Sequence, residues 1–255
     1  MDVDLSDLCD GARIVLDRLG EKGDAWIVGG WVRDRMIGKD SQDIDLATNL
    51  IPSEIKSTFP RSIMVGEDFG TVLVRVEDSK GRDFQCEVTT LRKDGGYTDG
   101  RRPDNVIFGN AIEEDLARRD FTINAMAIKP MKGLVGVECP LGKLIDLDGR
   151  GAKDLESGLL STVGQAEKRI AEDGLRIVRA FRFLDLGEGG LREFDPELSI
   201  AISSNLSMLN KVSKERIWNE LQRILSCSNS MRIVESMVEH GIFEEILPGI
   251  SINTN

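Results

Sequence analysis

Near residue 150 the hydrophobic pattern of this 255-residue chain changes, and the change limits the architectures open to it. Before that point, short apolar or alternating runs between glycines and turn residues predict strands interleaved with helices. Beyond it strand signals nearly vanish, and apolar residues recur at helical spacing. The sequence therefore predicts an α/β head followed by an all-helical region, with helices expected at 165–184, 196–209, 213–226 and 229–241.

The residue composition excludes several kinds of active site. The single histidine, His240, excludes a Ser-His-Asp triad, a Cys-His pair or a multi-histidine zinc site elsewhere, and is itself expected at the surface near a helix end. The four cysteines lie far apart without a C-x-x-C pair, which favours a reduced, cytoplasmic compartment. There is no signal-peptide pattern and no apolar run long enough to span a bilayer, so no membrane partner is expected.

The charge balance bears on possible partners. Asp and Glu number 44 against 33 Lys and Arg, which gives a formal net charge of −11 at pH 7. Such a chain has no overall electrostatic attraction to nucleic acid. Contact with RNA or a nucleotide must then come from local basic clusters or from bound cations.

A glycine pair follows the first predicted buried strand. Residues 25–28 form a continuous apolar run, Gly29 and Gly30 break it, and residues 31–37 are predicted to be helical. Glycines let the backbone approach a phosphate, and the helix that follows supplies N–H donors. Arg33 in the first turn would add a bidentate phosphate contact, with Asp34 expected to hold either the loop or Arg33. A tight corner between strand and helix explains the glycines equally well.

Two aspartates shortly afterwards favour the first explanation. Residues 43–46 alternate polar and apolar, which predicts a strand with Asp43 and Asp45 on one face. Burying two such carboxylates costs several kcal/mol unless a cation binds between them, and their oxygens suit Mg²⁺. Glu87 lies on the polar face of a predicted strand at 82–91. The three carboxylates are typical of a two-metal phosphoryl-transfer site, although a solvated strand face is the alternative.

Ordered blocks extend this pattern from about residue 24 to residue 226. They are GGWVRD and DIDL (29–34, 43–46), EVTTLR (87–92), YTDGRRP (97–103), DLARRDFTINAMA (115–127), EDGLRIVRAFRF (172–183) and SKERIWNEL (213–221). Together they resemble the class II tRNA nucleotidyltransferase (CCA-adding enzyme) and bacterial poly(A) polymerase family of the DNA polymerase β-like superfamily. No single block would carry this resemblance.

The resemblance implies a domain order and a set of site residues. A nucleotidyltransferase head at residues 1–145, a small mixed β-sheet with flanking helices, would precede an all-helical neck and the start of the body at residues 146–255. Asp43 and Asp45 would bind Mg²⁺, with Glu87 as the third catalytic carboxylate. Arg119 and Asp120 would contact the sugar and phosphates of the nucleotide. The residues implied in nucleotide binding are Gly29, Gly30, Arg33, Arg119, Asp120, Asn124, Asp173, Arg176 and Arg179.

The predicted helix 165–184 would read the base. Asp173 and Arg176 are three residues apart, so both would lie on one helix face together with Glu172 and Arg179. A surface ladder of ion pairs is the plain alternative. In the light of the resemblance, an Asp acceptor beside an Arg donor matches the edges of cytosine and adenine and rejects uracil and guanine. We therefore expect CTP and ATP as substrates.

Two features distinguish activities within the family. The loop 93–105, which carries Tyr97, Asp99, Arg101 and Arg102, is of the kind that accompanies the switch from adding C to adding A. Residues 68–72 have the form of the tRNA enzymes. Both favour addition of CCA, or part of it, to the 3′ ends of tRNA. A poly(A) polymerase and a non-catalytic nucleotide- or RNA-binding module remain the alternatives.

The C-terminal part departs from the family pattern. Residues 213–226 resemble the neck helix, with Ser213 expected as its N-cap and Arg216 and Glu220 expected to brace adjacent helices. From the resemblance we expect the family's helical body and tail to be absent or truncated after Asn255. Binding of tRNA would then need a homo-oligomer, a partner chain or local basic residues. A glycine at position 174, inside the base-reading helix, costs about 1 kcal/mol relative to alanine and would mark a hinge.

Overall fold

The computed structural model describes residues 1–41, 43–66, 70–94, 106–131 and 133–249. Within these ranges the chain packs as two units. The head unit comprises Met1–Asp94, Val106–Arg119 and Asn124–Ala152, and the helical unit comprises Asp120–Ile123 together with the chain from Lys153 onward. The division between the two units falls inside helix α5 (Arg150–Ser157).

The short segment Asp120–Ile123 belongs to the helical unit because of its aromatic residue. Phe121 forms an antiparallel bridge with Thr162, and its ring meets Phe183 edge-on with the centroids 5.5 Å apart. The hydrophobic pattern of the chain does not reveal such a contact, because the partners lie far along the sequence.

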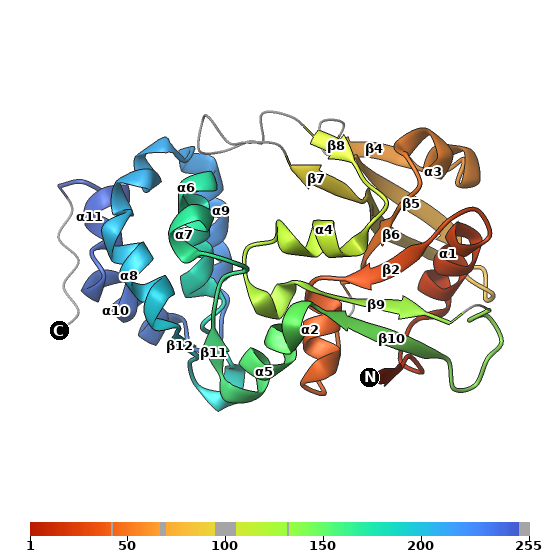
Figure 1. The fold of residues 1–255 in the computed structure, drawn as a ribbon, viewed down its shortest axis with the longest axis horizontal. Helices are drawn as coiled ribbons and strands as arrows, with labels where there is room; N and C mark the ends of the chain where they lie inside the picture. The colour runs from red at the N-terminus through yellow and green to blue at the C-terminus, as the bar shows by residue number, and fades with distance from the viewer. Residues whose placement is uncertain (42, 67–69, 95–105, 132, 250–255) are drawn as a thin grey trace. The chain divides into compact units, whose positions relative to one another are not determined.

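Eight strands of the described chain form one mixed sheet in the head unit, in the order β1-β10-β9-β2-β3-β6-β5-β4 (Figure 1). Strands β3 and β6 run parallel, and the other neighbours in this sheet are antiparallel. The predicted mixed sheet is thus confirmed. Its strands are β1 (Asp2–Asp4), β2 (Ala25–Val28), β3 (Asp45–Thr48), β4 (Ile63–Gly66), β5 (Thr71–Glu77), β6 (Asp83–Thr90), β9 (Met126–Pro130) and β10 (Leu141–Asp146), and a separate pair joins β7 (Arg92–Asp94) to β8 (Val106–Phe108).

One strand boundary differs from its prediction. The strand expected at 43–46 begins only at Asp45, so Asp43 and Ile44 precede it. The reason lies in β2, whose last residue, Val28, pairs with Asp45 before the chain turns at Gly29. Asp43 and Ile44, which precede Asp45, therefore have no backbone partner on β2.

Helices flank this sheet as expected (Figure 1). Helix α1 packs closely on β6, since a Cβ atom on Gly11 would lie 2.4 Å from the Cβ of Phe84. Helix α4 packs Ile112 and Leu116 onto Trp26 in a buried cluster. The head helices are α1 (Asp10–Gly20), α2 (Gly30–Met36), α3 (Pro52–Thr58) and α4 (Ile112–Ala117), with 3₁₀ turns at Thr122–Asn124 and Leu147–Gly149.

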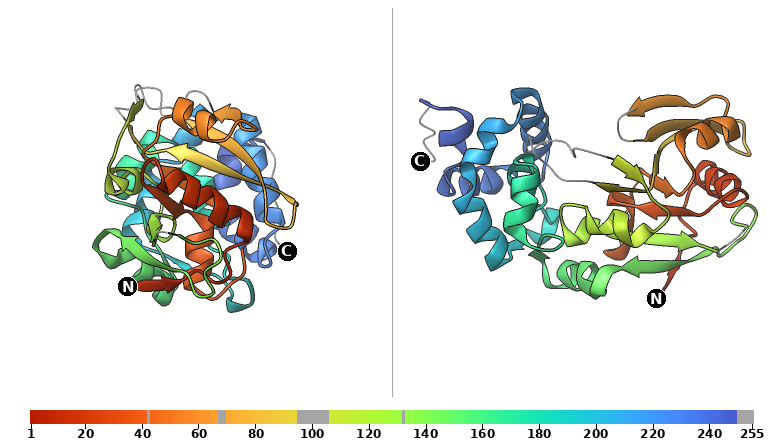
Figure 2. Two further views of the ribbon diagram at one scale, coloured as in Figure 1. Left: turned by 90° about the vertical axis from the view of Figure 1, so that its right-hand side faces the viewer. Right: turned by 45° about the horizontal axis from the view of Figure 1, so that its top comes forward.

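The helical unit consists mainly of helices, as predicted (Figure 2), and it also contains a pair of two-residue strands. Strand β11 (Leu159–Leu160) pairs in parallel with β12 (Glu193–Phe194), so the region is not purely helical. None of the helices described here combines the length and the apolar character needed to cross a bilayer. The helices are α6 (Ala166–Glu172), α7 (Leu175–Arg182), α8 (Pro196–Ser204), α9 (Lys214–Leu225), α10 (Ser230–Glu239) and α11 (Ile242–Ile246), with 3₁₀ turns at Gly187–Gly189 and Leu206–Lys211.

The predicted continuous helix 165–184 is wrong, because the chain breaks between α6 and α7. Asp173 is extended, with φ −154° and ψ 107°, and ends α6. A Cβ atom at Gly174 would lie 2.5 Å from the carbonyl oxygen of Met208, so only glycine fits there. Gly174 therefore serves close packing against the segment around Met208.

Candidate functional site

Carboxylates from two adjacent parallel strands meet in the head unit. Asp45 on β3 pairs in register with Glu87 on β6, so both side chains point to the same face of the sheet. Burial, and then the charges of Asp43 and Glu87, raise the pKa of Asp45 to about 6, while Arg119 opposes the rise. The predicted strand neighbourhood of Asp45 and Glu87 is confirmed, and Asp43 lies close enough to act on Asp45.

These carboxylates fit a divalent cation in chemistry. Among the described residues, no three or more His, Cys, Asp or Glu side chains are arranged so that they could hold a metal ion together. Burial, followed by the like charges of Asp43 and Glu87, makes the ionised form of Asp45 unfavourable. Carboxylate oxygens that repel one another are suitable ligands for a hard cation such as Mg²⁺.

This electrostatic cost predicts a stability effect. Unfolded aspartate titrates at its ordinary value of 3.8 and folded Asp45 at about 6, so the fold prefers the protonated carboxyl. Stability linked to Asp45 therefore falls as pH rises from about 4 to about 6, by up to about 3 kcal/mol. Without divalent cations, Asp45→Asn should unfold at a higher urea concentration than the parent protein at about pH 7.5. This difference between the two unfolding midpoints should shrink toward pH 4. Asp83→Asn, at an exposed position of β6, serves as the control. An Asp45→Asn advantage that is equal at both pH values would contradict the assignment.

The predicted glycine turn lies beside Asp45. Gly29 has φ +73°, a left-handed conformation that favours glycine, and it forms the N-cap of α2. A Cβ atom there would lie 3.4 Å from Asp45 Oδ2 and 3.7 Å from Arg119 Nη1. The turn thus brings bare backbone next to both a carboxylate and a guanidinium, as close approach of a phosphate requires.

Asn124 connects two arginines of the head unit. Arg33 donates from Nη1 to Asn124 Oδ1 at 2.8 Å and from Nε to Asp34 Oδ1 at 2.9 Å, so of the two roles expected for Asp34 the structure shows the contact with Arg33. Arg119 donates to the main-chain oxygen of Asn124 at 3.3 Å. Asn124 is only 7% exposed, and its buried Nδ2 has no hydrogen-bond partner within the described chain. An unpaired donor beside two cations fits a ligand rich in anionic oxygens.

Asp120 and Arg179 form an ion pair within the helical unit. Asp120 Oδ2 accepts hydrogen bonds from Arg179 Nε at 2.8 Å and Nη2 at 2.6 Å. Burial alone would raise the pKa of Asp120, but Arg179 outweighs it and lowers that pKa. Arg119 and Asp120 thus follow each other in sequence yet belong to different units. A nucleotide contact for Asp120 or Arg179 stays a prediction.

Asp173 and Arg176 each have an ionic partner. Asp173 accepts from Arg216 on α9, with Oδ2 2.6 Å and Oδ1 3.2 Å from its guanidinium. Arg176, 9% exposed, donates to Glu172 Oε2 at 2.6 Å and to the Arg169 carbonyl at 2.8 Å. The break after α6 takes Asp173 out of the helix that holds Arg176, so the expected single helix face does not exist.

Glu220 and Arg216 brace helices as predicted. Glu220 on α9 accepts from Arg182 at 2.6 Å and from Arg179 at 3.3 Å, both on α7. Ser213 is the N-cap residue of α9, without a side-chain cap hydrogen bond. His240 ends α10 and packs its ring against Phe181.

Sequence reasoning missed the buried carboxylate of Asp115. Asp115 on α4 is 2% exposed and bonds Arg118 and Arg119. Its spacing of three and four residues from these arginines was the available signal. The loop residues Tyr97, Asp99, Arg101 and Arg102, and residues 68–69, lie outside the described ranges.

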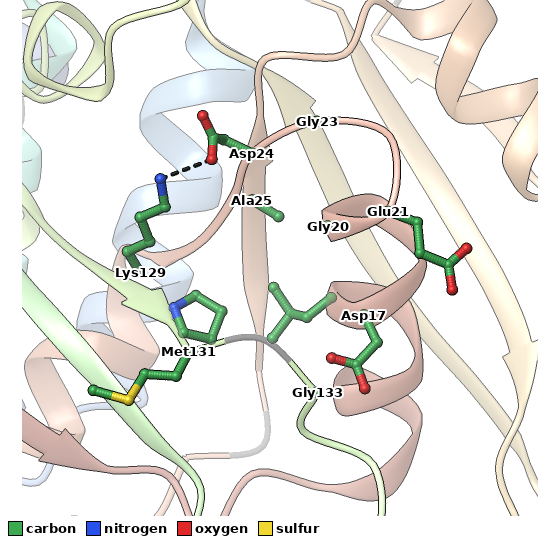
Figure 3. Close-up of a pocket in the computed structure, with 11 residues that line it drawn as sticks. Asp17, Gly20, Glu21, Gly23, Asp24, Ala25, Lys129, Met131 and Gly133 are labelled. Carbon is green, nitrogen blue, oxygen red and sulfur yellow. Dashed lines mark hydrogen bonds and ion pairs between the residues drawn. The ribbon is translucent and has the colours of Figure 1, made fainter.

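The head unit also contains a cavity of about 430 Å³, which none of the predicted site residues lines (Figure 3). It lies at the end of α1 and the start of β2, whereas Gly29 follows the last residue of β2. Lys129 pairs with Asp24 at 2.7 Å there, and Asp17 accepts from the main-chain nitrogens of Leu134 and Val135. The first contact ties the residue before β2 to β9, and the second ties the loop after β9 to α1.

The fold is a head with one mixed sheet and flanking helices, followed in sequence by a helical region. The chain belongs to the poly A polymerase head domain family, whose sequence model, described as "Poly A polymerase head domain", matches residues 25–161. A second model, described as "Probable RNA and SrmB- binding site of polymerase A", matches residues 193–253. The predicted family is confirmed.

Two curated relatives are CCA-adding enzymes. The chain is 40% identical over 247 residues to a CCA-adding enzyme of Lactobacillus gasseri, covering 96% of this chain and 57% of that protein. With a CCA-adding enzyme of Geobacillus stearothermophilus it shares 38% identity over 239 residues, covering 93% and 54%. The chain thus spans little more than half the length of the curated relatives it matches.

Solved structures confirm the fold class. A crystal structure of Bacillus stearothermophilus CCA-adding enzyme in complex with CTP superposes with TM-score 0.78 at 34% identity, covering 94% of this chain and 54% of that one. A tRNA nucleotidyltransferase complexed with a primer tRNA and an incoming ATP analog gives TM-score 0.71 at 27% identity, covering 92% and 62%.

Proposed function

We propose that this chain carries the nucleotide-transfer machinery of a CCA-adding enzyme, which adds C and A to tRNA 3′ ends from CTP and ATP with Mg²⁺. The observation that carries the proposal is Asp45, held in register with Glu87 and raised in pKa beside a left-handed glycine turn. The names of the relatives and the complexes with CTP, an ATP analog and tRNA support the substrate choice.

In the proposed mechanism the RNA 3′-hydroxyl attacks the α-phosphate, and pyrophosphate leaves. Asp43 and Asp45 would hold Mg²⁺, with Glu87 completing the carboxylate set. When bound, Mg²⁺ lowers the pKa of a hydroxyl and stabilises charge on phosphate oxygens. Arg33 and Arg119 compensate the triphosphate charge, and the unpaired Nδ2 of Asn124 donates to a phosphate or ribose oxygen.

In the helical unit, Asp173 and Arg176 would choose the base. Cytosine and adenine each present a ring acceptor beside an amino donor, which matches Arg176 as donor and Asp173 as acceptor. Uracil and guanine reverse this order and would leave buried groups unpaired, at about 1–3 kcal/mol each. Asp173→Ala should reduce discrimination against UTP and GTP by about 10- to 100-fold, measured as the ratio of kcat/KM values. Unchanged discrimination would refute the base-reading role.

Extension of tRNA decides among the candidate functions. Purified protein is incubated with Mg²⁺, CTP and ATP and with tRNAs that end before the first C, after CC, and with CCA complete. We expect one to three added nucleotides on the shortened tRNAs and none on the complete tRNA. High tRNA concentrations are needed, because the net charge of −11 disfavours RNA binding.

Other products would identify the alternatives. A long adenosine tail would indicate a poly(A) polymerase, which the description of the matching family model supports. The absence of Mg²⁺-dependent pyrophosphate release would indicate a non-catalytic binding module. A homo-oligomer or a partner chain that adds RNA contacts remains a prediction, to be tested by measuring the mass of the complex with tRNA.

A further inference from the structure

Asp115 on α4 divides its carboxylate between two arginines. Oδ1 accepts from Arg118 Nε at 3.0 Å and Nη2 at 2.5 Å. Oδ2 accepts from Arg119 Nε at 3.3 Å and Nη2 at 3.2 Å. Because the side chain is only 2% exposed, water offers the two guanidinium groups little competition for this carboxylate. One buried charge therefore holds two cations, which leaves the cluster with one positive charge in excess.

The hydrogen-bond pattern orients Arg119. The guanidinium contacts Asp115 along its Nε and Nη2 edge, so Nη1 remains for the other side. That nitrogen donates to the Asn124 carbonyl at 3.3 Å and lies 3.7 Å from the place of a Cβ on Gly29. Arg119 thus presents its remaining edge to the glycine turn.

Asp45 is the competing partner for Arg119. The place of a Cβ on Gly29 lies 3.4 Å from Asp45 Oδ2 and 3.7 Å from Arg119 Nη1, so both side chains approach the same turn. Within the described part of the chain, Arg119 forms its ion pair with Asp115 and not with Asp45. Without Asp115, the nearby unpaired carboxylates would be the strongest attraction for this arginine.

We propose that Asp115 is a positioning residue, which keeps Arg119 beside the glycine turn for the triphosphate and away from Asp45, so that Asp45 remains free to bind a cation. The inference rests on the proposed nucleotide transfer. It concerns a residue that touches neither nucleotide nor metal and acts through Arg119.

The test compares Asp115→Asn, which keeps the shape and removes the charge, with Glu113→Gln, an exposed position on the same helix. We expect Asp115→Asn to raise the KM for CTP and the Mg²⁺ concentration for half-maximal rate about tenfold or more, as loss of a charge-assisted contact implies. Calorimetry should show CTP binding weakened by a similar factor. The Glu113→Gln control should match the parent in all three measurements.

Two further variants separate positioning from a purely structural role. If Asp115 acts through Arg119, then adding Asp115→Asn to Arg119→Gln changes the KM no further, whereas independent effects would multiply. If Asp115→Asn fails to fold, Asp115→Asn with Arg118→Gln restores the local charge balance and should show the same defects. CTP and Mg²⁺ constants equal to the parent's in either folded variant would overturn the inference. An inactive parent would instead overturn the proposed function.

Discussion

Asp43→Asn or Asp45→Asn is expected to abolish nucleotide transfer while both units remain folded. Asp45 shares its register with Glu87 on the neighbouring strand, and Asp43 acts on it through its charge. Removing one carboxylate would remove a ligand of the proposed Mg²⁺ site, whose stabilisation of the transition state is worth several kcal/mol. The expected loss in kcat is therefore at least about 10³-fold. Radiolabelled CTP incorporation into a shortened tRNA measures it.

The matched control is Asp83→Asn, the same chemical change at the start of β6. Its carboxylate is exposed and pairs with Arg61 on the surface, so activity should stay within about twofold of the parent. Near-normal incorporation by either Asp43→Asn or Asp45→Asn would remove the metal assignment. The combination of lost activity with gained stability in Asp45→Asn would be hard to explain by misfolding.

Glu220→Gln is expected to destabilise the helical unit by about 3 kcal/mol, in the range seen when one partner of a buried ion pair is removed. Glu220 is 4% exposed and accepts from Arg179, Arg182 and Arg223. Without the charge of Glu220, Arg179 and Arg182 on α7 lose a shared ionic partner. Arg179 keeps its ion pair with Asp120. Hydrogen exchange of the α7 and α9 amides reports this loss locally, and urea unfolding reports it globally.

Glu215→Gln provides the comparison for Glu220. It is an exposed carboxylate in the first turn of the same helix, where its loss should cost no more than about 1 kcal/mol. If the two variants unfold at the same urea concentration, Glu220 does not hold α7 and α9 together.

The catalytic strand pair could be predicted because its signals are local. In each strand, the alternation of polar and apolar residues identifies the face that carries Asp45 or Glu87. Pairing of the two strands then brings these two faces side by side. The family blocks extended the same information to Arg33 and Asn124. The start of β3 was wrong by two residues because the end of the neighbouring strand decides it.

The break at Gly174 could not be predicted, because its cause is a long-range contact and not a local pattern. Helical periodicity continues through positions 170–181, and the constraint comes from the Met208 carbonyl, which is distant in sequence. The same applies to Phe121, which belongs to the helical unit through Thr162 and Phe183. Long-range backbone contacts of this kind leave no period in the sequence.

The parallel pairing of β3 with β6 constrains how this gene can diverge. An insertion or deletion of one residue between Asp83 and Glu87 would turn the glutamate to the opposite face of the sheet and part it from Asp45. The hairpin tip at Asp78–Gly81 faces no such requirement. Alignments of distant homologues should accordingly accumulate gaps at that tip and preserve the length of the strand beside it.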